Sequence, residues 1–204
     1  NIAHDLRTPL TSLHNKLEQL ELENPQVSNL TDQVNLILNT FNALLRISHL
    51  ESGNANVSIQ EVDLTSLTTD VIDLYLPLAE EKDQVISMSL ESRWVNADIN
   101  LLFQAIANLV ENAIKYAPEH STIIISSAEQ KDHVAISIKD EGPGVPNDQL
   151  IEIVERFVRL DKTRNTPGNG LGLSMVKAIT DAHQGRILFE NFDSGFSATI
   201  LVPS

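Results

Sequence analysis

Two series of apolar residues, spaced alternately by four and three positions, dominate the first 53 residues of the chain. The first series is Leu6, Leu10, Leu13, Leu17 and Leu20, and the second is Leu30, Val34, Ile37, Phe41 and Leu44. This spacing forms the seam of packed α-helices. Asn24-Pro25 separates the two series, and proline disfavours helix in the residue before it. The pattern therefore predicts a helical hairpin over residues 1–53.

The second seam is widened by Leu38, Leu45 and Ile47. A wide apolar stripe suits a four-helix bundle better than a two-stranded coiled coil. Because one hairpin supplies only two helices, we expect two copies of the chain to pair as a homodimer. Ser52-Gly53-Asn54 supplies the turn residues that end the second helix.

Beyond residue 54 the periodicity changes to short alternating segments mixed with helical ones. Strands are predicted over 57–62, 85–90, 121–127, 133–139, 185–191 and 196–202. Helices are predicted over 64–82, with an interruption at Pro77, over 99–116, and over 171–183 with Gly185 as the stop. Residues 54–204 therefore predict an α+β sandwich as a second domain.

Composition excludes several classes of protein. The 204 residues contain no cysteine, which excludes a disulfide scaffold, a thiolate metal site and a cysteine nucleophile. The net charge of −14 argues against a nucleic-acid or anionic-membrane binder that works by bulk charge. No apolar run approaches the ~20 residues needed to span a bilayer. Since the chain starts at Asn1, we expect a fragment of a longer protein, with any membrane segment upstream.

The first candidate for chemistry is the segment from His4 to Pro9. His4 and Thr8 share one face of the predicted helix, away from the seam, and Pro9 tends to kink it. A neutral imidazole is a nucleophile at neutral pH, and Asp5 is placed to fix its tautomer and take its proton. A solvent-facing histidine on a coiled coil is the alternative.

The second candidate lies on the helix predicted over 99–116. Asn108 and Asn112 are four residues apart on one face, although asparagine is a poor residue for a helix interior. Their amide oxygens suit a hard cation such as Mg²⁺, and Lys115, one turn on, suits a phosphate. A plain polar face explains the pattern equally well.

Two further candidates are rich in glycine. Asp140-Glu-Gly142-Pro-Gly144 follows a predicted strand, where a carboxylate can accept from an exocyclic amine and glycine lets backbone approach a flat ligand. Basic residues cluster from Arg156 to Arg164, before Gly168-Asn-Gly170-Leu171-Gly172 at the start of a helix. No Lys-Ser/Thr follows these glycines, so they are not a P-loop. Ordinary surface turns are the alternative for both segments.

Together, the order and spacing of these motifs strongly resemble those of bacterial two-component sensor histidine kinases. Residues 1–10 resemble the H box, 108–115 the N box, 140–144 the G1 box, 155–159 the F box and 168–172 the G2 box. The resemblance implies a dimerisation and phosphotransfer hairpin, followed by a Bergerat-type ATP-binding domain. In one departure, Val154 stands where the F box often begins with Phe, so we expect looser packing of the lid over ATP.

The resemblance also implies roles for single residues. His4 would be phosphorylated, Asp5 would be its acid–base partner, and Thr8 would assist dephosphorylation of a partner regulator. ATP and Mg²⁺ would be bound by a set of residues in the second domain: Asn108, Asn112, Lys115, Tyr116, Asp140, Gly142, Gly144, Arg159, Gly168, Gly170, Leu171 and Gly172. Within this set Asn112 and Asn108 are the metal ligands, and Asp140 binds the adenine amino group.

The implied activity is ATP-dependent autophosphorylation on histidine, with transfer to an aspartate of a response regulator receiver domain. The implied location is the cytoplasmic part of a bacterial inner-membrane sensor. Two other functions remain open: a Bergerat-fold ATPase of the gyrase, Hsp90 or mismatch-repair type, and a non-catalytic dimerisation module. The H-box residues argue against the first, and the complete set of nucleotide motifs argues against the second.

Overall fold

The computed structural model describes residues 9, 11–12, 14–17, 20, 28–53, 55–91, 93–160, 168–193 and 195–204. The chain divides into two compact units, Asn1–His49 and Leu50–Ser204. His4, Asp5 and Thr8 lie outside the described residues. In the described part of the chain, no helix is long and apolar enough to cross a membrane. The domain boundary after residue 53 stays a prediction.

The first unit is helical wherever it is described. Residues 9, 11–12, 14–17 and 20 are helical, and α2 runs over Ser28–Glu51. Val34 of the predicted seam is buried, but Leu30 and Ile37 are 53% and 52% exposed in the single chain. These two side chains are therefore available to a second copy, and the homodimer stays a prediction.

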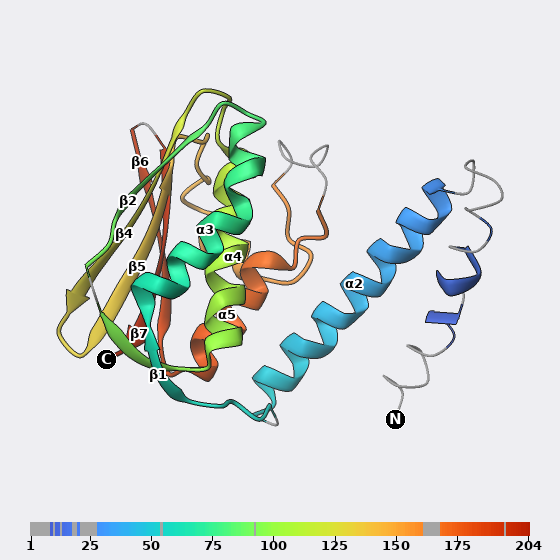
Figure 1. Cartoon of the computed structure of the whole chain (residues 1–204), viewed down its shortest axis with the longest axis horizontal. Helices are drawn as coiled ribbons and strands as arrows, with labels where there is room; N and C mark the ends of the chain where they lie inside the picture. The colour runs from blue at the N-terminus through green and yellow to red at the C-terminus, as the bar shows by residue number, and fades with distance from the viewer. Residues whose placement is uncertain are drawn as a thin grey trace. The chain divides into compact units, whose positions relative to one another are not determined.

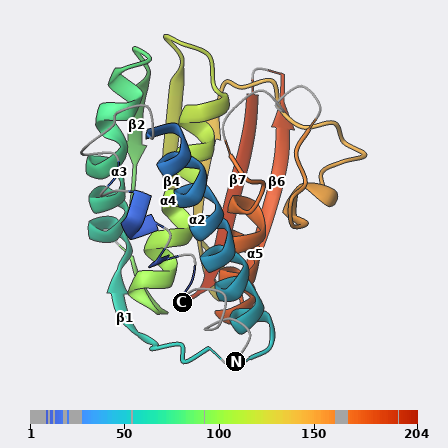
Figure 2. The same cartoon turned by 90° about the vertical axis from the view of Figure 1, so that its right-hand side faces the viewer.

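The second unit is a sheet with helices on one face, as Figures 1 and 2 show. The helices are α3 (Leu64–Glu80), α4 (Ile99–Tyr116) and α5 (Gly172–Ala182). The five-stranded sheet has the order β2-β4-β5-β7-β6, built from β2 (Val85–Ser89), β4 (Thr122–Gln130), β5 (His133–Asp140), β6 (Arg186–Phe192) and β7 (Gly195–Pro203). β2 and β4 are parallel, and the other neighbours are antiparallel. This mixed α+β architecture confirms the predicted fold class for the second domain.

Isoleucines on the inner face of the sheet form the centre of the core. Ile125 of β4 pairs with Ile138 of β5, and Ile136 of β5 pairs with Ile200 of β7. None of these four side chains is more than 2% exposed. Burying one such side chain stabilises a fold by about 1.5–3 kcal/mol. This face of the sheet packs against α4 and α5.

Aspartates set the starts of two helices. Asp63 accepts hydrogen bonds from the backbone N–H groups of the first turn of α3, and Asp98 does so for α4. Asp98 also accepts from the Ser58 N–H at 3.0 Å, and its own N–H donates to His183 Nε2 at 2.9 Å. Burial tends to raise the pKa of Asp98, but the backbone donors outweigh it and hold the pKa below its usual value.

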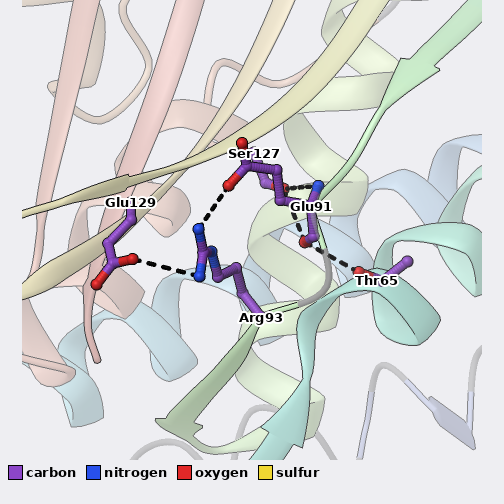
Figure 3. A network of polar contacts seen from close by, with 5 residues as sticks. All are labelled: Thr65, Glu91, Arg93, Ser127 and Glu129. Atoms are coloured by element: carbon purple, nitrogen blue, oxygen red, sulfur yellow. Dashed lines mark hydrogen bonds and ion pairs between the residues drawn. The ribbon is translucent and has the colours of Figure 1, made fainter.

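The sequence did not predict β3 (Trp94–Ala97), which pairs with β1 (Gln60–Asp63) as a separate two-stranded sheet. A polar network fixes the chain just before β3, as shown in Figure 3. The Arg93 guanidinium pairs with Glu91 at 2.6 Å and Glu129 at 3.2 Å. The Ser127 and Thr65 hydroxyls both donate to the Glu91 carbonyl at 3.2 Å. Contacts distant in sequence therefore position this strand, which explains why local alternation did not reveal it.

Two details of the helices differ from the prediction. α3 continues through Pro77 without interruption, because proline removes one hydrogen bond while its own carbonyl still accepts from the Glu81 N–H at 3.0 Å. Gly185 is not the left-handed residue that stops α5. Gln184 takes that conformation, with φ +56°, and the Gly185 N–H donates to the Thr180 carbonyl at 2.8 Å, as in a Schellman motif.

Candidate functional site

A cleft lies between α4, the start of α5 and the loop after β5. It has two parts, the apolar hollow and the polar hollow, which share Asn112, Tyr116 and Arg159 on their walls. The apolar hollow encloses about 790 Å³ of empty space, including its open mouth. Its apolar walls include Leu109, Ala113, Ile138, Leu173, Phe196 and Ala198.

Asp140 is the acidic group in the apolar hollow. It ends β5 and is only 7% exposed. The Gly142 N–H donates to its Oδ1 at 2.7 Å, and burial raises the pKa of its carboxyl from 3.8 to about 6. A buried carboxylate among apolar walls can accept a hydrogen bond from the polar edge of a flat ligand.

Gly142 makes this arrangement possible. A Cβ on this residue would lie 2.5 Å from Asp140 Oδ1 and 3.1 Å from the Tyr116 carbonyl oxygen. Any larger residue would push the loop away from the carboxyl. The backbone of Gly142 therefore fixes the Asp140 carboxyl. Gly142 itself does not line the cleft but a neighbouring hollow.

The polar hollow is lined by one face of α4. Asn108, Glu111, Asn112 and Lys115 are on its wall, as their spacing of three and four residues requires. The Asn108 amide donates to the Gln104 carbonyl at 2.8 Å, which orients its Oδ1 toward the start of α5. A Cβ on Gly172 would lie 3.2 Å from that oxygen. The two asparagines and the first turn of α5 therefore face one another closely.

Lys115 and Tyr116 contribute a charge and a ring at the end of α4. Lys115 Nζ lies 4.8 Å from the centre of the Tyr116 ring, a cation–π contact. A Cβ on Gly168 would lie 2.5 Å from Lys115 Nζ. Lys115 thus lies on the wall of the polar hollow, with its ammonium group against an aromatic face and close to Gly168, where an anionic ligand can reach it.

The first turn of α5 differs from the starts of the other two helices on the sheet. Among the described residues, α3 and α4 begin with aspartate caps, whereas the N-cap of α5, Leu171, makes no side-chain capping bond. The backbone N–H groups of that turn carry the positive end of the helix dipole. With Gly172 on the wall of the polar hollow, they form a site suited to an anion such as phosphate.

The loop beyond the 3₁₀ helix Glu152–Val154 joins the glycine-rich segment by its backbone. The Phe157 N–H donates to the Gly170 carbonyl at 3.0 Å. Phe157 has φ +65° and Gly170 has φ +69°. A Cβ on Gly170 would lie 2.9 Å from the Phe157 carbonyl carbon, so the contact requires glycine there. The predicted F and G2 segments are therefore adjacent at the cleft, and residues 161–167 between them lie outside the described part.

The structure brings most of the predicted binding residues of the second domain together. The cleft is lined by Asn108, Asn112, Lys115, Tyr116, Asp140, Gly144, Arg159, Gly168, Gly170 and Gly172. Leu171 is 2% exposed and not on the wall of either hollow, so its side chain belongs to the core beneath α5. The individual roles assigned to these residues stay predictions.

The sequence did not single out the apolar walls as part of a site. Leu109 and Ala113 have the same spacing as core residues of α4, and Ile153 and Phe196 lie in no motif. Their residue types carry no signal of a ligand. Phe196 is placed at the site by its pairing in register with Asp140, which the sequence alone does not show.

Asn108 and Asn112 offer amide oxygens as ligands for a metal ion. Within the described ranges, no three His, Asp or Glu side chains gather to hold a metal. Amide oxygens, water and ligand phosphates are acceptable ligands for Mg²⁺, which commonly keeps several of its waters. Asn108 and Asn112 therefore fit a metal that arrives with a phosphorylated ligand.

Comparison with known proteins agrees with this geometry. The family model of histidine kinase-, DNA gyrase B- and HSP90-like ATPases matches residues 97–204, just over half of the chain. The chain belongs to this family. The match begins directly before α4 and includes every described element that lines the cleft.

The similar members of the family are sensor kinases. The chain is 34% identical over 202 residues to the adaptive-response sensory kinase SasA of Synechocystis sp., covering 91% of this chain and 53% of the relative. It is 30% identical over 217 residues to the sensor histidine kinase WalK of Bacillus subtilis, covering 100% of this chain and 36% of the relative. The chain thus spans about half the length of these relatives or less. The predicted resemblance to sensor histidine kinases is confirmed.

Solved structures give the same result. Full-length ShkA in complex with AMPPNP superimposes with a TM-score of 0.88 at 26% identity, covering 99% of this chain and 44% of that chain. The catalytic domain of the histidine kinase ThkA superimposes with a TM-score of 0.65 at 30% identity, covering 72% of this chain and 95% of that domain. The ATPase-family fold of the second unit is therefore that of histidine kinase catalytic domains.

Proposed function

We propose that this chain is the dimerisation and catalytic part of a sensor histidine kinase. It binds ATP with Mg²⁺, transfers the γ-phosphoryl group to His4, and passes it on to an aspartate of a response regulator receiver domain. The observation that carries the proposal is the division of the cleft, which has a buried carboxyl in an apolar hollow at one end and cationic and amide groups at the other.

Each part of the cleft has a matching part of ATP. The apolar hollow takes adenine, with Asp140 accepting a hydrogen bond from the exocyclic amine. Lys115, Arg159 and the first turn of α5 meet the phosphates. Asn108 and Asn112 would hold Mg²⁺, which when bound neutralises charge on the phosphates. The chain's own groups thus supply orientation and charge, the two main contributions to phosphoryl transfer.

The covalent step is a displacement at the γ-phosphorus by the neutral imidazole of His4. A nitrogen–phosphorus bond forms, and the bond to the oxygen that bridges the β- and γ-phosphorus breaks with its electron pair leaving on ADP. The proton of the other ring nitrogen passes to the Asp5 carboxylate. In the second stage a receiver-domain carboxylate attacks the phosphorus, the nitrogen–phosphorus bond breaks, and the imidazole of His4 takes its proton back from Asp5. The same proposal includes recognition of the receiver domain and pairing of two copies of the chain through the α2 seam. It also includes an inner-membrane sensor upstream of these residues.

Incubation with ATP labelled at the γ-phosphate tests the proposal. The expected result is label on the protein that is stable in base and lost in acid, as a phosphohistidine requires. His4→Gln should prevent labelling, and His14→Gln, a change at another histidine of the same predicted helix, should not. Hydrolysis of ATP without label on the protein would favour a gyrase- or Hsp90-type ATPase instead. Absence of both ATP binding and label would leave a dimerisation module.

A further inference from the structure

Asn191 breaks the pattern of the edge strand β6. The inward-facing positions of this strand are Ile187, Phe189 and Asn191, and the positions between them are exposed. Asparagine is depleted in strands, and here it takes a place where the alternation predicts an apolar residue. No motif of the sequence includes it. Its side chain therefore needs an explanation other than packing.

The Asn191 amide bonds both backbone polar groups of one residue in the loop after β5. The Val145 N–H donates to Asn191 Oδ1 at 3.0 Å, and Asn191 Nδ2 donates to the Val145 carbonyl at 2.7 Å. The same Nδ2 donates to Asn147 Oδ1 at 2.8 Å, which uses both amide hydrogens. One side chain thus pairs with the loop as a neighbouring strand would.

Two glycines show that the loop and the β6–β7 hairpin are fitted to each other. Gly144 has φ +67°, and a Cβ there would lie 2.6 Å from Asn191 Oδ1. At the other end of the loop, a Cβ on Gly195 would lie 1.8 Å from the Asp140 carbonyl oxygen. The hairpin therefore holds the backbone at both ends of residues 140–145.

This loop is a wall of the apolar hollow. Pro143, Gly144 and Val145 line it together with Asp140. Asp140 is fixed by strand pairing with Phe196, but Val145 lies beyond the end of β5, where ladder hydrogen bonds no longer hold it. We propose that Asn191 is a positioning residue of the nucleotide site, which holds the Gly144–Val145 backbone at the distance that adenine requires. The proposal rests on the proposed function.

Asn191→Ala tests this role in the full 204-residue chain, with Glu190→Ala as the matched control on the exposed face of the same strand. ATP affinity by calorimetry should fall about tenfold in Asn191→Ala and stay within twofold of wild type in Glu190→Ala. Loss of the two neutral hydrogen bonds to Val145 is of that order. Amide hydrogen exchange at Val145, measured without nucleotide, should become at least tenfold faster in Asn191→Ala only. A residue that merely stabilises the fold would lower the unfolding temperature without this local change.

Asn191→Asp covers the case in which the alanine variant does not fold. It has the same size and still accepts from the Val145 N–H, but its carboxylate cannot donate to the Val145 carbonyl. The same loss of ATP affinity is expected. Affinity within twofold of wild type in the folded variants overturns the proposal, as does unchanged exchange at Val145. If wild type itself binds no ATP, the proposed function fails, whereas wild-type binding with unaffected variants removes only the role of Asn191.

Discussion

Asp140→Asn should stabilise the second unit at pH 8 while weakening its affinity for ATP. Burial raises the pKa of Asp140 from 3.8 to about 6, so the fold pays a penalty for its charged form. At 1.36 kcal/mol per pKa unit, that penalty is about 3 kcal/mol above pH 6. An asparagine removes it, and its side-chain oxygen can still accept from the Gly142 N–H that now bonds Asp140 Oδ1 at 2.7 Å.

The pH dependence follows from the sign of the shift. Because the folded-state pKa lies above the unfolded value, the contribution of Asp140 to stability is fully present below pH 3.8 and is lost as the pH rises through about 6. The advantage of Asp140→Asn should therefore be close to zero near pH 4 and approach its full size at pH 8. Urea unfolding followed by fluorescence of Trp94, the single tryptophan of the chain, reports on the second unit.

Binding should change in the opposite direction. A hydrogen bond from the adenine amine to a charged acceptor contributes about 1.5–3 kcal/mol, so the variant should bind ATP roughly 10–100-fold more weakly at pH 8. Wild-type affinity should also fall below pH 6, as Asp140 takes up a proton. The ATP phosphates titrate in the same pH range. The pH dependence of ATP affinity in Asp140→Asn therefore measures the contribution of the phosphates alone. A variant that is less stable than wild type at pH 8, or that binds ATP equally well, would refute the reasoning.

Five further changes test other parts of the molecule. His4→Gln should abolish autophosphorylation and leave ATP affinity within twofold, measured by titration with a fluorescent nucleotide; a large loss of affinity would contradict the two-domain organisation. Thr8→Ala should keep autophosphorylation but lose phosphatase activity toward a phosphorylated regulator, while Asp5→Ala should mainly lose kinase activity; decay assays in ADP compare them. Asn112→Ala should weaken ATP binding with Mg²⁺ and have a smaller effect without it, as calorimetry in the presence of a chelator would show. Gly195→Ala should cost about 3 kcal/mol or more in unfolding free energy, because its Cβ would lie 1.8 Å from a carbonyl oxygen of β5; wild-type stability would contradict that contact.

The sequence predicted the bounds of an element correctly where the residues that begin and end it lie next to it in the chain. α4 has the bounds predicted for it, because a strong apolar periodicity follows the capping residue Asp98 directly. β3 carried no such signal. Its four residues are placed by pairing with β1 and by the network around Arg93, and those partners are distant in sequence.

The residues of the site could likewise be predicted only where the sequence itself carries a signal. Residues that are unusual for their place were found, such as Asn112 inside a helix and Asp140 at the end of a strand. Residues that look like ordinary core, such as Phe196, were not. Asn191 was missed although it is unusual for a strand, because its main partner is the backbone of Val145, which leaves no mark in the sequence.

The position of β7 in the sheet has a consequence for biosynthesis. This strand is the last one described along the chain, yet it lies inside the sheet between β5 and β6. A nascent chain cannot join the β6–β7 hairpin to the earlier strands until residues near Pro203 have left the ribosome. Because Phe196 and Ala198 of this strand also line the apolar hollow, a prematurely terminated chain would lack both the strand that joins the sheet and a wall of the nucleotide site. The binding site can therefore form only after β7 has been synthesised and has joined the sheet.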